Sequence, residues 1–189
     1  LSVAVFFFSF AVRQLSCGRG SAMFTHPIGS HENESMLPDD VFRERLEKTL
    51  VDLETWAEET RGSADIAITA SDRYWRMVVR PFFQGACPFE LLIKASQTFD
   101  LALDREAYEN KPVQRFDLFL ILAKAIVAGH VERIETRNEL TGILTNVAMR
   151  VELAPGWDWI GSRTVLKRFI RPLEANEEQS ASRCLSYSR

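Results

Sequence analysis

Four short runs of alternating apolar and polar residues follow one another between positions 64 and 104, and this pattern restricts the fold most. The runs are ADIAITA (64–70), RYWRMVVR (73–80), FELLIKA (89–95) and TFDLALD (98–104). Side chains of a strand point alternately to its two faces, so each run has one apolar and one polar face. The short gaps between the runs predict antiparallel hairpins.

Two helices are predicted, one on each side of these runs. Residues 38–61 carry one apolar stripe at helical spacing, made of Phe42, Leu46, Leu50, Leu53 and Ala57. The segment VQRFDLFLILAKAIVAG (113–129) is apolar nearly all round. It is too long for a typical buried strand and too short to span a membrane, so we predict a buried helix that ends at Gly129.

Further strands are predicted after the second helix. HVERIETR (130–137) has a weak strand pattern, whereas TGILTNVAMRVELA alternates clearly up to Pro155. WDWI is a candidate short strand, and RTVLKRFIR (163–171) is a candidate short helix. The predicted order is therefore α-ββββ-α-ββ(-α), an α+β fold with one antiparallel sheet of about six strands and helices packed on one face.

One folded domain is expected from residue 36 to residue 171, because periodicity is lost on both sides. Residues 1–35 open with the uncharged run LSVAVFFFSFAV, which is too short for a membrane span and lacks the basic start of a signal peptide. We interpret them as a disordered or mis-called extension, with a signal-like segment as the alternative. Residues 172–189 are polar and serine-rich, and a disordered tail is expected.

Charge and cysteine content restrict the partners and the compartment. The formal net charge of −3 and the pI of about 5.7 argue against a nucleic-acid partner. Cys17, Cys87 and Cys184 are far apart and form no CxxC pair, which argues against a disulfide framework and a zinc site. We expect no cofactor and no metal, and a cytoplasmic location. Export and membrane association are the alternatives if residues 1–12 are a true signal segment.

Four polar or aromatic residues are candidates for a binding site. Tyr74, Arg76 and Arg80 share the polar face of the second run, where basic groups interleaved with an aromatic suit a nucleic-acid strand. The alternative is an ordinary solvated sheet face. His130 is the single histidine within 36–171 and follows the predicted helix stop. It suits either a catalytic role or the dipole of a helix C-terminus, and we favour the second.

The stretch PGWDWIG carries the two remaining candidates. Trp157 and Trp159 point to the same side if the segment is extended. Exposed tryptophans are typical binding anchors. Both, however, have the parity of the apolar face of residues 143–153, which favours a place in the core.

The sequence leaves two classes of function open. The first is a non-enzymatic protein-binding adaptor or chaperone-like module that binds a protein partner or a second copy of itself as a homodimer. Residues 39–59 include eight acidic and only three basic residues, and this negative charge suits a basic partner surface. The order of elements resembles that of the small acidic chaperones that escort secreted effectors. The alternative is a small-molecule-binding or enzymatic domain with a pocket near the sheet and Trp157/Trp159.

Overall fold

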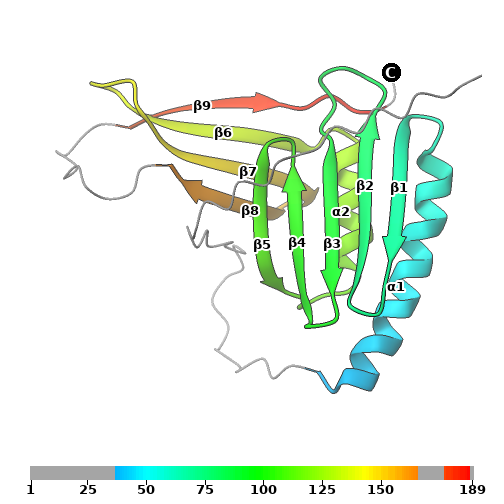
Figure 1. Ribbon diagram of the computed structural model, residues 1–189. Helices are drawn as coiled ribbons and strands as arrows, with labels where there is room; N and C mark the ends of the chain where they lie inside the picture. The colour runs from blue at the N-terminus through cyan, green and yellow to red at the C-terminus, as the bar shows by residue number, and fades with distance from the viewer. Residues whose placement is uncertain (1–36, 166–176, 188–189) are drawn as a thin grey trace, which may run out of the picture.

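The computed structural model describes residues 37–165 and 177–187, which form an α+β fold with two antiparallel sheets (Figure 1). The first sheet has five strands in chain order: β1 (Ala64–Ala70), β2 (Tyr74–Pro81), β3 (Phe89–Lys94), β4 (Thr98–Leu103) and β5 (Glu106–Pro112). The second sheet has the strand order β8-β7-β6-β9, formed by β6 (Val131–Asn138), β7 (Leu144–Ala154), β8 (Trp157–Thr164) and β9 (Glu177–Arg183). The two helices are α1 (Asp39–Thr60) and α2 (Leu118–Val127).

Both helices pack on the same face of the first sheet. The inward side chains of its central strands are buried: Trp75, Met77, Val79, Phe89, Leu91, Ile93, Phe99, Leu101 and Leu103. Trp56 of α1 contacts Phe89 with ring centroids 6.3 Å apart. Phe119 of α2 meets Phe99 edge to face at 5.1 Å. The alternation therefore predicts the buried face of β2, β3 and β4 correctly.

The helix α2 packs against both sheets, which explains why its sequence is apolar nearly all round. It contacts α1 on one side and β7 on another, and most of its side chains are buried. A single core cluster runs from the first sheet through α2 to Val131, Met149 and Val151 of the second sheet. The helix ends before Gly129, whose φ of +81° is in the left-handed region that favours glycine.

The prediction of one sheet with about six strands is wrong, although the α+β class and the antiparallel pairing are confirmed. The chain leaves the first sheet at the end of β5, passes through α2 and starts a separate sheet at β6. Residues 130–137 and 141–154, both predicted as strands, form most of β6 and β7. The face of β7 predicted to be apolar has Val147, Met149 and Val151 fully buried.

The strand β5 replaces a predicted polar connection. Its sequence EAYENKP shows no apolar alternation, because the residues that point inward are Glu106 and Tyr108. Both are buried although neither is an aliphatic residue. A local hydrophobic pattern cannot identify such a strand, since the burial of Glu106 depends on charged partners elsewhere in the chain.

The C-terminal part also differs from its prediction. Glu177–Arg183 form β9, which pairs with β6, where a disordered tail over 172–189 was expected. All seven residues of β9 are exposed, so only backbone hydrogen bonds reveal this strand. Arg163 and Thr164 belong to β8 and not to a helix. Residues 166–171 of the predicted helix, residues 172–176 of the predicted tail and the predicted extension 1–35 lie outside the described residues.

The first helix agrees closely with its prediction. The predicted range 38–61 corresponds to Asp39–Thr60, with Pro38 at the N-cap and Phe42, Leu53 and Ala57 of the stripe buried. Within the described residues, no helix is both long and apolar enough to cross a membrane.

Candidate functional site

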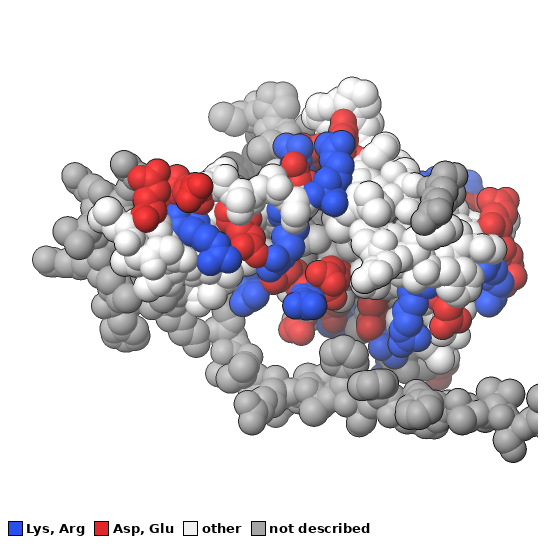
Figure 2. Space-filling model, turned by 90° about the horizontal axis from the view of Figure 1, so that it is seen from above, with Lys and Arg blue, Asp and Glu red and all other residues white. Residues whose placement is uncertain are grey.

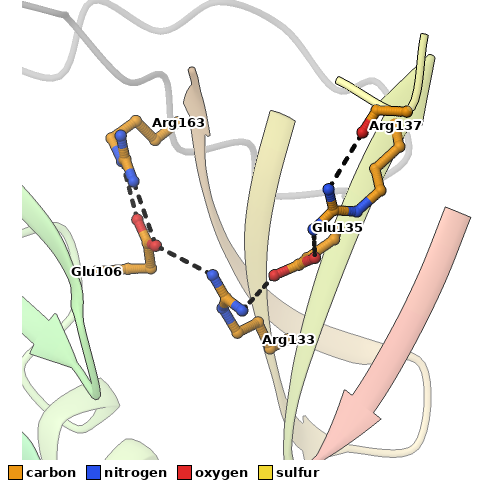
Figure 3. A network of polar contacts seen from close by, with 6 residues as sticks. Glu106, Arg133, Glu135, Arg137 and Arg163 are labelled. Carbon is orange, nitrogen blue, oxygen red and sulfur yellow. Dashed lines mark hydrogen bonds and ion pairs between the residues drawn. The ribbon is translucent and has the colours of Figure 1, made fainter. Parts of the chain in front are cut away.

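A chain of charged side chains joins the two sheets (Figure 3). Glu106 on β5 is almost completely buried and is met by two arginines of the second sheet. Arg163 of β8 donates to it with Nε–Oε2 and Nη2–Oε1 distances of 2.9 and 3.3 Å. Arg133 of β6 lies 3.6 Å away, from its Nη2 to Oε1. The two guanidinium groups compensate a carboxylate that would otherwise be costly to bury.

The chain continues along β6 toward the solvent. Arg133 also donates to Glu135, and Arg137 donates to Glu135 at 2.8 Å and to the carbonyl of Gly142 at 3.2 Å. The hydrogen bond from Arg137, followed by the charge of Arg133, lowers the pKa of Glu135 below its usual 4.5. The charged side chains of this network thus alternate in sign from the sheet junction to the hairpin between β6 and β7.

Aromatic rings form the apolar side of the same junction. Tyr108 of β5 meets Trp159 of β8 edge to face at 5.2 Å, and both are buried. Gly161 leaves the room for this contact, since a Cβ there would come within 2.6 Å of Tyr108 and 2.7 Å of Trp159. Burial and then the charge of Glu106 raise the pKa of Tyr108 well above 10.0. These contacts hold the sheets together, and Trp159 is a core residue.

The remaining tryptophan candidate has different surroundings. Trp157 is half-buried, and the guanidinium of Arg115 lies 4.4 Å from the centre of its ring. Arg115 in turn pairs with Asp117. The two tryptophans share a strand face, as expected, but only Trp159 reaches the core. They therefore do not form an exposed pair of binding anchors.

The polar candidates on β2 lie on the outer face of the first sheet. Tyr74 is 42% exposed. Arg76 forms a two-point pair with Glu90 on β3, at 2.7 and 2.9 Å, and Arg80 lies 3.7 Å from Asp65 on β1. Cross-strand carboxylates thus neutralise both arginines, which is the pattern of a solvated sheet face.

His130 does not join these residues. It is exposed and lies in the connection between α2 and β6, which precedes the second sheet in the sequence. Tyr74 is the first residue of β2 in the first sheet. Its backbone is held by Ala125 and Glu152. Among the hydrogen bonds and ion pairs of residues 37–165 and 177–187, none joins His130 to Tyr74 or Arg76.

Sequence reasoning did not find the groove between α1 and β1. This β1 groove has a volume of about 440 Å³ and is lined by Val51, Glu54, Thr55, Glu58, Arg61 and Ile68. The first four follow the spacing i, i+3, i+4 and i+7 and so share one face of α1. Val51 is 61% exposed although it is an aliphatic residue on an otherwise polar helix face. That isolated apolar residue is the one signal that could have marked the groove.

The strand beside the groove has an open backbone edge. Among the described strands, β1 pairs only with β2 and is therefore an edge strand. The hydrogen bonds from Phe82 to Ser63 and from Ser71 to Tyr74 fix the pairing, so Asp65, Ala67 and Thr69 bond to β2. The amide and carbonyl groups of Ile66, Ile68 and Ala70 consequently point away from the sheet, at the groove.

Hydrogen bonds hold two of the charged side chains that line the groove, Arg61 and Glu54. Arg61 donates to the outward carbonyl of Ile66 at 3.3 Å and pairs with Glu58 at 2.8 Å. Glu54 accepts a hydrogen bond of 3.1 Å from the indole of Trp75, which fixes α1 against β2. Arg61 thus covers one acceptor of the edge and offsets the charge of Glu58, so that the helix side of the groove, its acidic wall, carries a net charge of −1 from Glu54, Glu58 and Arg61.

The surface shows how charge is distributed elsewhere. In Figure 2, acidic and basic side chains are intermixed and separated by uncharged areas, and this face shows no continuous basic surface. The described part of the chain contains no group of three or more His, Cys, Asp or Glu residues that could hold a metal ion. Comparisons with known protein families, with curated proteins and with solved structures found no match.

Proposed function

We propose that this protein is a protein-binding adaptor or chaperone-like module that holds an extended segment of a partner along the edge of β1. The observation that carries the proposal is the position of that open edge beside the β1 groove. An extended segment would add a strand to the first sheet through the outward groups of Ile68 and Ala70. Its side chains on one face would enter the groove, which is how strand addition combines affinity with specificity.

The groove selects the chemistry of the partner. Glu54 and Glu58 form its acidic wall, and α1 as a whole has far more acidic than basic residues. Val51 and Ile68 also line the groove and offer apolar surface to a bound segment. A strand that alternates aliphatic and basic residues would match both features, because opposite charges at an interface favour association and exclude acidic competitors.

Binding of a defined peptide tests this proposal. A fluorescent ten-residue peptide of alternating valine and lysine is expected to bind the full chain, and its valine–glutamate counterpart is not. The change Ile68→Pro removes an outward amide without removing a hydrogen bond to β2, because proline lacks the donor and is tolerated on edge strands. Peptide binding should fall at least about tenfold. Ile68→Ala is the matched control for loss of the side chain alone.

Equal binding by the parent and the Ile68→Pro variant, with both folded by circular dichroism, would refute edge pairing. Binding of the acidic peptide as strongly as the basic one would refute the role of the acidic wall. A homodimer is the outcome if sedimentation shows a dimer of the parent that Ile68→Pro dissociates. In that case a second copy, and not a foreign segment, occupies the edge.

The alternative pocket at Trp157 and Trp159 has less support. Trp159 is 1% exposed and packs against Tyr108. Trp157 is already covered by Arg115. Neither ring is available as the floor of a small-molecule site, whereas the β1 groove is open along a strand edge.

A further inference from the structure

Two cysteines that are far apart in the sequence lie next to each other in the fold. Cys87 is in the connection between β2 and β3, and Cys184 directly follows β9. Their flanking residues Ala86 and Leu185 form a parallel β-bridge. The bridge brings the β2–β3 connection and the segment after β9 side by side, with Cys87 and Cys184 each one residue away from a bridged residue. Both cysteines are free, and the interaction between their thiols shifts the pKa of each, while the Cys87 thiol donates to the carbonyl of Pro88 at 3.5 Å.

Backbone hydrogen bonds hold the segment after β9 to the body, the first from the amide of Cys184 to the carbonyl of Val131 at 2.9 Å. Leu185 donates from its amide to the carbonyl of Gly85 at 3.0 Å, and Tyr187 donates from its amide to Val127 at 2.9 Å. The Tyr187 side chain is fully buried, and its hydroxyl donates to the carbonyl of Cys87. Gly129 permits this close approach, since a Cβ there would come within 2.7 Å of the Ser186 amide.

The burial of Tyr187 contrasts with the exposure of the strand before it. All residues of β9 are solvent-exposed, so the apolar anchoring of this end of the chain rests on Tyr187 and its neighbours. A segment that follows a wholly exposed strand can open locally at a lower cost than the core. A covalent link at Cys184 would act at the point where the exposed strand meets its anchor.

We propose that Cys87 and Cys184 form a reversible disulfide that fastens the C-terminal segment to the β2–β3 connection. This inference is independent of the peptide-binding function, because neither cysteine lines the β1 groove. The reduced pair is the state of the structure described above. The oxidised pair would hold Tyr187 in its buried position and suppress opening of the segment.

The two thiols differ in a way that sets the order of the reaction. Cys184 is half-buried, and its interaction with the Cys87 thiol lowers its pKa, whereas that interaction and burial raise the pKa of Cys87. The Cys184 thiolate would attack a small-molecule disulfide such as oxidised glutathione, form a mixed disulfide and release one thiol. Cys87, after losing its proton, would attack the Cys184 sulfur and release the second thiol. Two protein thiols become one disulfide, and one external disulfide becomes two thiols.

The full chain with Cys17→Ser tests the pairing, because it leaves only these two cysteines. After treatment with oxidised glutathione we expect loss of both free thiols, a mass lower by two hydrogens and a proteolytic peptide that links Cys87 to Cys184. The same treatment in guanidinium chloride should give mainly glutathione adducts, because unfolding separates the pair. A folded protein that keeps two free thiols, or a stable glutathione adduct, would overturn the proposal.

Hydrogen exchange tests the consequence for the segment. In the oxidised Cys17→Ser chain, the amides of Leu185 and Tyr187 should exchange at least about tenfold more slowly than in the reduced chain, because opening of the segment is suppressed. The midpoint of thermal unfolding should rise by about 5–10 °C, since the link constrains the unfolded chain. Exchange at Tyr187 that is the same in both states would show that the disulfide does not fasten the segment.

Discussion

Arg163 of β8 and Glu106 of β5 form a two-point ion pair across the junction of the two sheets, with N–O distances of 2.9 and 3.3 Å. The residues are 57 positions apart in the chain. The Glu106 side chain is 4% exposed and the Arg163 side chain is 48% exposed, so the pair connects the interior to the surface. Separation of the sheets would break this pair and leave the Glu106 carboxylate without its main partner.

Removal of the charge of Glu106 should therefore weaken the sheet junction. Glu106→Gln leaves Arg133 and Arg163 facing each other without a carboxylate, and we expect the free energy of unfolding to fall by about 1–3 kcal/mol, a value reduced for the exposure of Arg163. Urea denaturation measures this change. Asp65→Asn, in the exposed pair with Arg80, is the control and should change stability by less than about 0.5 kcal/mol. Equal changes in the free energy of unfolding for the two variants would show that the buried pair stabilises the fold no more than the exposed pair does.

The aromatic contact beside this pair depends on Gly161. In Gly161→Ala the new methyl group would lie within 2.7 Å of both Tyr108 and Trp159, two rigid buried rings that cannot move aside easily. Such overpacking should lower the free energy of unfolding by about 1–3 kcal/mol. Gly62→Ala is the matched control, because a Cβ there meets nothing within 4 Å. A Gly161→Ala protein as stable as the parent would mean that the sheets can shift apart without cost.

The ion pairs of Glu135 predict a pH-dependent contribution to stability. Its pKa is lowered in the folded state, so the unfolded chain binds the proton more readily, and the contribution is complete above the usual pKa of 4.5. It is lost as the pH falls through the lowered value. The difference in melting temperature between the parent and Glu135→Gln should thus be largest near pH 7 and shrink as the pH falls below the usual pKa of 4.5.

Melting curves across this range decide the question, with Glu59→Gln, an exposed glutamate of α1, as the control. A difference between the parent and Glu135→Gln that stays constant from neutral to acidic pH would contradict the ion-pair explanation.

Arg61 is expected to compete with a partner strand for the edge of β1. It donates to the outward carbonyl of Ile66, an acceptor that an added strand would use. Arg61→Ala should strengthen binding of the valine–lysine peptide roughly two- to fivefold, as measured by fluorescence anisotropy. Arg43→Ala removes the same charge from an exposed position of α1 and controls for electrostatics. If both changes strengthen binding equally, charge and not the edge carbonyl is responsible.

The sequence alone determined the elements whose burial follows a local pattern. The range of α1, the inward faces of β2, β3 and β4, and the buried face of β7 all follow from apolar residues at spacings that the helix and the strand impose. Gly129 was also recognised as a helix stop, because only its own backbone freedom was needed. In each case the information lies within a few neighbouring residues.

The site was predicted less well, for the same reason. Tyr74, Arg76 and Arg80 were placed correctly on a polar sheet face, but their pairing with carboxylates depends on the register of neighbouring strands. The β1 groove requires the packing of α1 beside β1, which no spacing within either element reveals. Trp157 and Trp159 share a strand face, yet the neighbours that cover each of them come from other elements.

Only the tertiary structure decided the elements that depend on distant partners. The strand β5 exists with Glu106 inside because Arg133 and Arg163 arrive from the second sheet to compensate its charge. The strand β9 buries no side chain and is held by backbone pairing with β6. Backbone hydrogen bonds do not require particular residue types, so the sequence of β9 shows no strand pattern. Cys87 and Cys184 meet because the segment after β9 returns to the β2–β3 connection. Ion pairs, edge hydrogen bonds and thiol contacts are formed between residues far apart in the chain, so a pattern of neighbours does not encode them.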